Sequence, residues 1–251
     1  IAEALCFSSA LQTLDLSDNS LRDEGARVVA TALRSNERLL KLNICSNGVG
    51  ARGACALAEA LGSNATLRSL DLHGNGKGGM GAAGARAFAR ALARNRALHK
   101  LNLCDNRLGV EGARALAEAL KSNRALRTLK LYNNGFGPLG TAAIASALGA
   151  NHALKCLDLG NNDIRAEGAC SLAEALRRNG RLETLELKGN GIGAEGARAL
   201  EGALSRNRRL LCLDVSGNEV GDEGARALAG ALCSGSALRK LDLEQNGIGD
   251  A

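Results

Sequence analysis

Aromatic residues and proline are nearly absent from this chain of 251 residues. It contains no Trp, one Tyr, three Phe and a single Pro, although 45% of its residues are hydrophobic and 32 are Gly. The hydrophobic residues are mostly Leu and Ala. A core of such small, uniform side chains suits a repeat protein, in which each unit buries its face against its neighbours, better than a domain with one large core.

Long apolar runs and blocks of like charge are also lacking. No run of 18 apolar residues is present, which excludes an ordinary transmembrane helix, and no signal peptide is recognisable. The 32 Lys and Arg exceed the 26 Asp and Glu only modestly, for a net charge of +6. We expect the arginines to be spread over solvent-facing helix surfaces, and we expect no membrane association. Because the chain does not begin with Met, we expect it to be part of a longer protein.

One pattern dominates what is there: L-x-x-L-x-L-x-x-N recurs nine times with conservative exchanges. The interval is 28 residues, except for one step of 31 that places a three-residue insertion near 76–80. The sequence therefore predicts a single repeat domain over 1–251, with about nine repeats, of which the first and last are incomplete. The closing asparagines are Asn19, Asn47, Asn75, Asn106, Asn134, Asn162, Asn190, Asn218 and Asn246.

Each repeat combines two periodicities. In its first half, Leu14 and Leu16 alternate with polar residues, which indicates a short strand with one buried face. In its second half, apolar residues recur at helical spacing, as at Ala113, Leu116, Ala117 and Leu120 of the fourth repeat. Acidic and basic residues three apart on the outer side are expected to pair within one helix: Glu24 with Arg27, Glu111 with Arg114, Glu195 with Arg198, and Glu223 with Arg226.

A strand followed by a helix, repeated, predicts an α/β fold: a right-handed βα solenoid with a parallel sheet on the concave side and helices on the convex side. Strands lie about 4.8 Å apart but helices are about 10 Å wide, so the stack is expected to curve into a horseshoe. Each closing asparagine carries both a donor and an acceptor. We therefore expect the nine asparagines to form a structural ladder that satisfies the buried backbone where the chain turns.

The full unit, L-x-x-L-x-L-x-x-N followed by a helix of the type E-G-A-R-A-L-A-E-A-L, resembles the ribonuclease-inhibitor-like class of leucine-rich repeats. The same units occur in the sensing regions of NLRC-type NOD-like receptors, in Ran GTPase-activating protein and in protist proteins. The resemblance implies a non-enzymatic protein–protein interaction scaffold, or the ligand-sensing region of a larger protein. The alternatives are a GTPase-activating domain and a structural spacer.

The eight cysteines fall into repeat register, which argues against disulfides. Cys45 and Cys104, like Cys156 and Cys212, occupy equivalent positions two strands apart, about 10 Å, which exceeds the reach of a disulfide. Free thiols favour a cytoplasmic location. His73 lies between Cys45 and Cys104 in one column, but the two outer thiols are too far apart to converge on zinc, so no metal site is predicted.

Two further motifs are interpreted as structural. The segment Gly74–Gly79 fits G-x-G-x-x-G, but Asn75 belongs to the ladder and the glycines belong to the insertion, so a loop is favoured over a nucleotide site. The glycosylation sequon Asn64-Ala65-Thr66 lies at a helix end where other repeats also carry Asn or a small polar residue. A cap-like role is therefore favoured for Asn64.

Neither a catalytic site nor a cofactor site is predicted. His99 and His152 occupy different repeat positions and have no recurrent partner, and no catalytic triad or pair of carboxylates can be assembled. The acidic column on the concave strands is expected to be flat, open and solvated, unlike the buried acids of enzymes. Binding of a small molecule is not expected on such a surface.

That acidic column is nevertheless the strongest functional signal. The central strand position carries six acids and one lysine in nine repeats, which favours a basic protein partner and disfavours nucleic acid on this face. Alternatively, Asp at this position only suits the strand of this repeat class. Tyr132 is the one large side chain available as an anchor. The predicted partner-binding residues are Asp71, Lys130, Tyr132, Asp158, Glu186 and Asp214.

Overall fold

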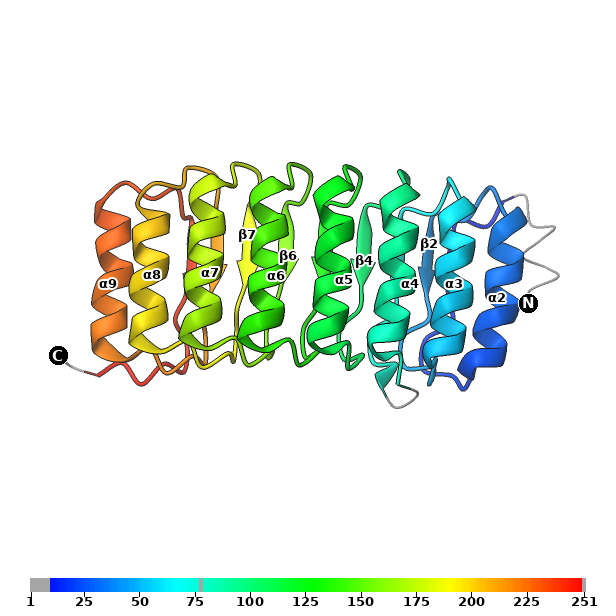
Figure 1. Ribbon diagram of the computed structural model, residues 1–251, viewed down its shortest axis with the longest axis horizontal. Helices are drawn as coiled ribbons and strands as arrows, with labels where there is room; N and C mark the ends of the chain where they lie inside the picture. Colours follow the sequence, from blue (N-terminus) through cyan, green and yellow to red (C-terminus); the bar gives the residue numbers. More distant parts are fainter. Residues whose placement is uncertain (1–9, 77–78, 250–251) are drawn as a thin grey trace.

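The computed structural model describes residues 10–76 and 79–249, and within them strands and helices alternate along a single stack (Figure 1). The strands are β1 (Thr13–Asp15), β2 (Lys41–Asn43), β3 (Ser69–Asp71), β4 (Lys100–Asn102), β5 (Thr128–Lys130), β6 (Cys156–Asp158), β7 (Thr184–Glu186), β8 (Cys212–Asp214) and β9 (Lys240–Asp242). The helices are α2 (Arg22–Ser35), α3 (Ala51–Ser63), α4 (Gly81–Arg94), α5 (Gly109–Ser122), α6 (Gly137–Ala150), α7 (Arg165–Arg178), α8 (Gly193–Leu204) and α9 (Gly221–Cys233).

The strands form one parallel sheet in sequence order, from β1 to β9. The register is the same at every step, so that Leu14 pairs with Leu42 and Leu42 with Leu70. The three-residue insertion does not disturb it, because Leu70 still pairs with Leu101 and the extra residues lie in the loop between β3 and α4. The predicted βα solenoid with 28-residue repeats is confirmed, and equivalent residues of successive repeats lie in straight columns.

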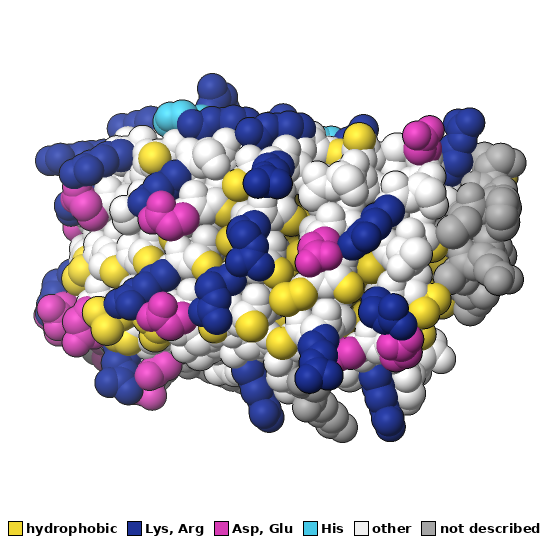
Figure 2. Space-filling view, turned by 45° about the vertical axis from the view of Figure 1, so that its right-hand side comes forward, with side chains coloured by type: hydrophobic (Ala, Val, Ile, Leu, Met, Phe, Trp, Pro, Cys, Tyr) yellow, Lys and Arg dark blue, Asp and Glu magenta, His cyan; other side chains and the backbone are white. Residues whose placement is uncertain are grey.

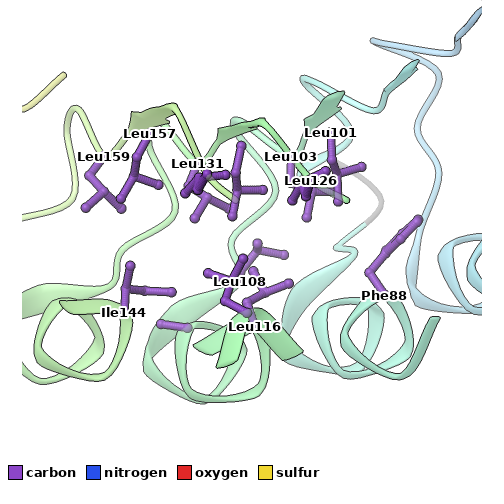
Figure 3. Packing of buried hydrophobic residues seen from close by; sticks show 14 of the residues in the cluster. Phe88, Leu101, Leu103, Leu108, Leu116, Leu126, Leu131, Ile144, Leu157 and Leu159 are labelled. Atoms are coloured by element: carbon purple, nitrogen blue, oxygen red, sulfur yellow. The ribbon is translucent and has the colours of Figure 1, made fainter. Parts of the chain in front are cut away.

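The core fills the space between the sheet and the helices. Strand leucines such as Leu157 and Leu159 point toward the helix layer, and helix residues such as Ile144 point back toward the strands (Figure 3). The largest fully buried side chains are Phe88 on α4 and Phe136 just before α6. A core made almost entirely of Leu and Ala is what the composition predicted.

Glycine lets neighbouring helices approach closely. A Cβ added to Gly112 of α5 would lie 3.0 Å from the Ala85 Cβ of α4 and 2.8 Å from the Leu108 Cβ. A Cβ at Gly224 of α9 would meet the Ala197 Cβ of α8 at 2.9 Å. The glycine that recurs near the start of each helix, followed by Ala in all of the described helices except α6, is therefore a packing requirement, since an extra methyl group would force the helices apart.

The outer helix faces carry ion pairs, with one difference from the predicted pattern. Glu24 pairs with Arg27, and Glu111 pairs with Arg114 at 2.7 Å, as predicted. Arg198 instead pairs with Glu223 of the next helix, so the predicted pairs of Glu195 with Arg198 and of Glu223 with Arg226 are wrong. Because the helices lie so close together, an acid one repeat away competes successfully with one on the same helix.

The asparagine ladder is confirmed in detail. The amide nitrogen of Asn162 donates to the carbonyl of Leu131 in the preceding repeat and to those of Leu159 and Gly160 in its own repeat. Its Oδ1 accepts the N–H of Asn134, 3.0 Å away, one repeat back. Each ladder asparagine from Asn47 to Asn246 is buried, whereas Asn19 in the first repeat is exposed. After the insertion, Asn106 Oδ1 has no partner among the described residues.

A second asparagine ladder runs along the opposite edge, where helices end and strands begin. Asn64 Nδ2 donates to the carbonyls of Leu33 and Asn36, at 2.8 and 3.0 Å, and its Oδ1 accepts the N–H groups of Thr66 and Leu67. The sequence pattern indicated only a cap-like role at this position, yet each side chain binds two repeats together. The buried members are Asn36, Asn64, Asn95, Asn123, Asn151, Asn179 and Asn207.

The position of Asn64 in the second ladder shows whether its glycosylation sequon is accessible. Asn64 is 5% exposed, and its amide nitrogen, the atom that glycosylation would modify, makes two hydrogen bonds to backbone carbonyls. The folded chain therefore does not present this sequon for modification. In the glycine-rich motif, residues 77 and 78 lie outside the described residues. Within the described ranges, no helix is long and apolar enough to cross a membrane.

Candidate interaction surface

The predicted acidic column exists as a continuous row across the sheet. Strand pairing places the side chains at the ends of β1 to β9 in direct register, from Asp15 next to Asn43 through to Asp214 next to Asp242. Lys130, Asp158, Glu186 and Asp214 occupy four adjacent strands. Asp71 lies two strands before Lys130, with Asn102 between them.

In the first half of this row, acids and amides alternate and bind one another. Asn43 Nδ2 donates to Asp15 Oδ2, and Asn102 Nδ2 donates to Asp71 Oδ2, both at 3.0 Å. The other carboxylate oxygen accepts the backbone N–H two residues later, as Asp15 Oδ1 does from Ser17 at 2.9 Å. The Ser17 hydroxyl also donates to Asp15 Oδ1 at 2.6 Å, and this hydrogen bond, followed by those from the Ser17 N–H and from Asn43, lowers the pKa of Asp15. Asp and Asn at this position thus also stabilise the turn that follows each strand.

The second half has no amides, and its acids are crowded. Asp158 is 7% exposed, with its Oδ1 accepting the Gly160 N–H at 3.0 Å. Burial raises the pKa of Asp158, although the Gly160 hydrogen bond and Lys130 oppose that shift. Burial and the neighbouring Asp158 charge likewise raise the pKa of Glu186. The expectation of an open, fully solvated column is wrong here, because neighbouring side chains cover Asp158.

Tyr132 lies close to Gly160, two residues after Asp158. A Cβ added to Gly160 would lie only 2.7 Å from Tyr132 Cδ2, so the aromatic ring lies directly over the Gly160 backbone. The ring is half-buried and Gly160 is buried. The column otherwise carries Ser, Cys, His, Tyr, Lys and Glu, so the missing side chain at Gly160 is the sequence signal for this arrangement. The repeat pattern alone did not reveal it.

A shallow hollow adjoins the acids toward the C-terminal end. It encloses about 240 Å³ and is lined by residues of β7, β8 and β9, including Glu186, Asp214 and Lys240. Lys240 Nζ lies 3.7 Å from Asp242 Oδ2, so its charge is directed partly to the last strand. Lys130 is exposed. The partner-binding residues predicted on β5 to β8 therefore form one contiguous surface, with Asp71 set apart from it.

All seven cysteines within the described residues are free thiols, four on or next to the strands and three in the helices. Cys6 lies outside the described residues. Burial raises the pKa of Cys104 to about 12 and that of Cys156 to about 11, so both stay protonated and are weak nucleophiles at neutral pH. His73 Nε2 lies 2.8 Å from Asp105 Oδ2 instead of bridging Cys45 and Cys104, and no metal-binding group is found among the described residues.

Positive charge is concentrated elsewhere, along the edge where helices end and strands begin. The eight loops between a helix and the following strand contain eleven Lys and Arg against two Glu, which leaves 21 against 24 in the rest of the chain. Figure 2 shows this as a band of Lys and Arg along the upper edge. Of the 24 Arg, 13 lie in the helices, as expected, but ten lie in these loops, a concentration that the expectation missed. We call these residues the basic rim: Arg38, Arg68, Arg96, Arg124, Arg127, Lys155, Arg181, Arg206, Arg208, Arg209 and Arg239.

Solved structures similar to this chain share its fold at low sequence identity. A tropomodulin C-terminal domain from Caenorhabditis elegans aligns with a TM-score of 0.50 and 17% identity, covering 61% of this chain and 91% of that one. The actin-binding site 2 of leiomodin-1 aligns with a TM-score of 0.45 and 18% identity, covering 70% and 86%. No curated protein matches the sequence.

The sequence does match a family model, described as leucine-rich repeat. The match covers residues 8–30, 94–117, 150–173, 181–200, 206–229 and 237–251, together just over half of the chain. The matched segments are spread from the first repeat to the last and agree with the strand and helix alternation of the structure. The chain belongs to the leucine-rich-repeat family.

Proposed function

We propose that this chain is a protein-interaction scaffold that binds a basic partner protein on the concave surface of β5 to β8. Leucine-rich repeats suit protein binding, because stacked repeats present a long, open sheet to a partner. We also propose that its repeats are of the ribonuclease-inhibitor-like class found in NLRC-type receptors. The proposed binding site consists of Lys130, Tyr132, Asp158, Glu186 and Asp214.

The observation that carries the proposal is the crowding of three acids on adjacent strands, with Lys130 as the one cation in their row. Asp158, Glu186 and Asp214 follow one another across the sheet, and the pKa values of the first two are raised by burial and by neighbouring carboxylates. A cationic group placed over them would relieve this repulsion. Tyr132 beside them offers a rigid ring of the kind that anchors interfaces.

The test uses variants that remove charge without removing the turn hydrogen bonds. Asn43 and Asn102 show that an amide at this position still accepts the backbone N–H two residues later. The triple variant Asp158→Asn, Glu186→Gln, Asp214→Asn should therefore fold normally and lose only the charges. A partner recovered by affinity capture should bind it at least about tenfold more weakly than wild type, mainly through slower association at low salt.

A matched control changes the first half of the row, where Asp15→Asn with Asp71→Asn should affect binding little. Tyr132→Ala should weaken binding by about 1–3 kcal/mol if the ring is an anchor. The proposal fails if the triple variant and Tyr132→Ala both bind like wild type while Arg114→Ala with Arg198→Ala on the convex helices abolishes binding.

A further inference from the structure

The basic rim runs straight along one edge of the stack, because the repeat register is constant, and its side chains occupy several loop positions. The residue just before each strand stacks on its counterpart in the next repeat: His99 N–H donates to the Arg68 carbonyl at 2.9 Å, and Arg127 N–H donates to the His99 carbonyl at 2.8 Å. Arg68, His99, Arg127 and Lys155 therefore follow one another on adjacent strands, within about 15 Å at the usual strand spacing. All four side chains are exposed.

These charges are largely uncompensated within the molecule. Among the described residues, Lys155 is the only rim cation with a carboxylate in ion-pair distance, Glu183 at 2.8 Å. Arg68 and Arg124 donate one guanidinium N–H each to a backbone carbonyl of the next repeat, at 2.9 and 3.3 Å. This holds the two planar groups in place with their remaining donors free. Burial and repulsion from Arg68 and Arg127 lower the pKa of His99, which agrees with an excess of positive charge.

We propose that the basic rim binds an acidic segment of a partner protein, independently of the concave surface. Ten of its eleven cations are Arg, whose planar fork binds a carboxylate through two parallel hydrogen bonds. An extended acidic peptide is narrow and flexible enough to follow this edge of the stack. The rim thus favours an acidic partner, whereas the concave surface favours a basic one.

The loops lack the features that other polyanions need. They contain no Trp, Tyr or Phe on which the bases of a single-stranded nucleic acid could stack. A duplex presents phosphates along two winding strands, so a band of cations along one straight edge would meet few of them. None of the exposed large hydrophobic residues among the described residues lies in these loops, so nothing there is available to insert into a bilayer.

The test measures fluorescence anisotropy of a labelled decaglutamate peptide with the whole chain at low and at physiological salt. The rim variant Arg96→Glu with Arg127→Glu is compared with Arg52→Glu with Arg86→Glu on the exposed faces of α3 and α4, which makes the same change in net charge. We expect the rim variant to lose about tenfold in affinity and the helix variant less than about twofold. The neutral pair Arg96→Gln with Arg127→Gln keeps the test valid if charge reversal impairs folding, as checked by circular dichroism.

A second readout reports location. The pKa of His99, followed by NMR, should rise when decaglutamate binds, because anionic groups would offset Arg68 and Arg127. The proposal is overturned if both double variants lose affinity equally, if His99 does not respond, or if polyuridine RNA or phosphatidylserine vesicles bind more tightly than decaglutamate at physiological salt. Because the concave triple variant leaves the rim intact, it should bind decaglutamate at least as well as wild type, which separates this test from that of the concave surface.

Discussion

The two halves of the concave row use the same backbone and differ in what the side chains do to one another. From β1 to β4, acids alternate with asparagines whose amides bind the neighbouring carboxylates, as Asn102 does with Asp71. From β5 to β8, Lys130 is followed by three acids without an amide between them. The carboxylates of the first half are bound by neighbouring amides, whereas the row offers no amide to those of the second half. Equivalent repeat positions therefore need not be functionally equivalent.

The largest expected effect is a loss of stability when a charge is placed in the leucine layer that supports both halves of the row. Leu157 of β6 is fully buried and Leu42 of β2 is 2% exposed. Changing either to Asp should cost on the order of 4 kcal/mol or more, because a buried carboxylate without a partner is very unfavourable. Urea unfolding followed by circular dichroism measures the loss, with the conservative Asp158→Asn as the control. Wild-type-like unfolding of either variant would contradict the register described above.

The asparagine ladder should respond differently in the two halves. Asn162→Ala removes hydrogen bonds from both the nitrogen and the oxygen of the amide, and we expect a loss of about 2–3 kcal/mol. Asn106→Ala should cost about 1 kcal/mol less, because Asn106 Oδ1 has no partner among the described residues. Denaturant unfolding of both variants provides the comparison. Equal losses would mean that the insertion does not weaken the ladder.

The pH dependence of stability should differ between the two halves of the concave row. The pKa values of Asp158 and Glu186 are raised above 3.8 and 4.5, so the folded protein binds these protons more tightly than the unfolded chain. Their effect on folding is therefore unfavourable above the raised pKa values and disappears as the pH falls below 3.8. We expect Asp158→Asn with Glu186→Gln to be more stable than wild type at pH 7 and to lose that advantage on acidification.

Asp15 gives the opposite expectation, because hydrogen bonds lower its pKa. Asp15→Asn should bring no gain in stability at pH 7, and any contribution of the Asp15 charge is lost as the pH falls through its lowered pKa. Thermal melts at several pH values test both variants. If Asp15→Asn stabilised the protein as much as the double variant, the contrast between the two halves would be refuted.

The smallest effect concerns the contact between Tyr132 and Gly160. Gly160→Ala would place a Cβ 2.7 Å from Tyr132 Cδ2 and 3.3 Å from the Lys188 carbonyl, so the ring must move. We expect a loss of about 1 kcal/mol. Gly62→Ala in α3, where a Cβ meets nothing within 4 Å, should instead be neutral or stabilising. Thermal melting compares them, and a stabilising Gly160→Ala would show that the ring does not rest on this glycine.

The sequence alone predicted the solenoid, the first asparagine ladder and the order of the acidic row. These follow from local rules that repeat at a fixed interval: an alternating strand, an amphipathic helix and an asparagine at the turn. With a constant interval, residues equivalent in sequence must become neighbours in space. Columns such as Asp15, Asn43 and Asp71 therefore follow from the repeat interval alone, and the pairing of Glu24 with Arg27 follows from their spacing within one helix.

Only the tertiary structure decided how neighbouring columns interact. The approach of α8 and α9 brought Glu223 to Arg198, and the lack of a side chain at Gly160 let the Tyr132 ring approach the Gly160 backbone. The basic rim was dispersed in the sequence, because each loop contributes only a few cations separated by a whole repeat. Stacking at strand spacing turns these isolated charges into one continuous edge, since distances between repeats depend on packing and not on position along the chain.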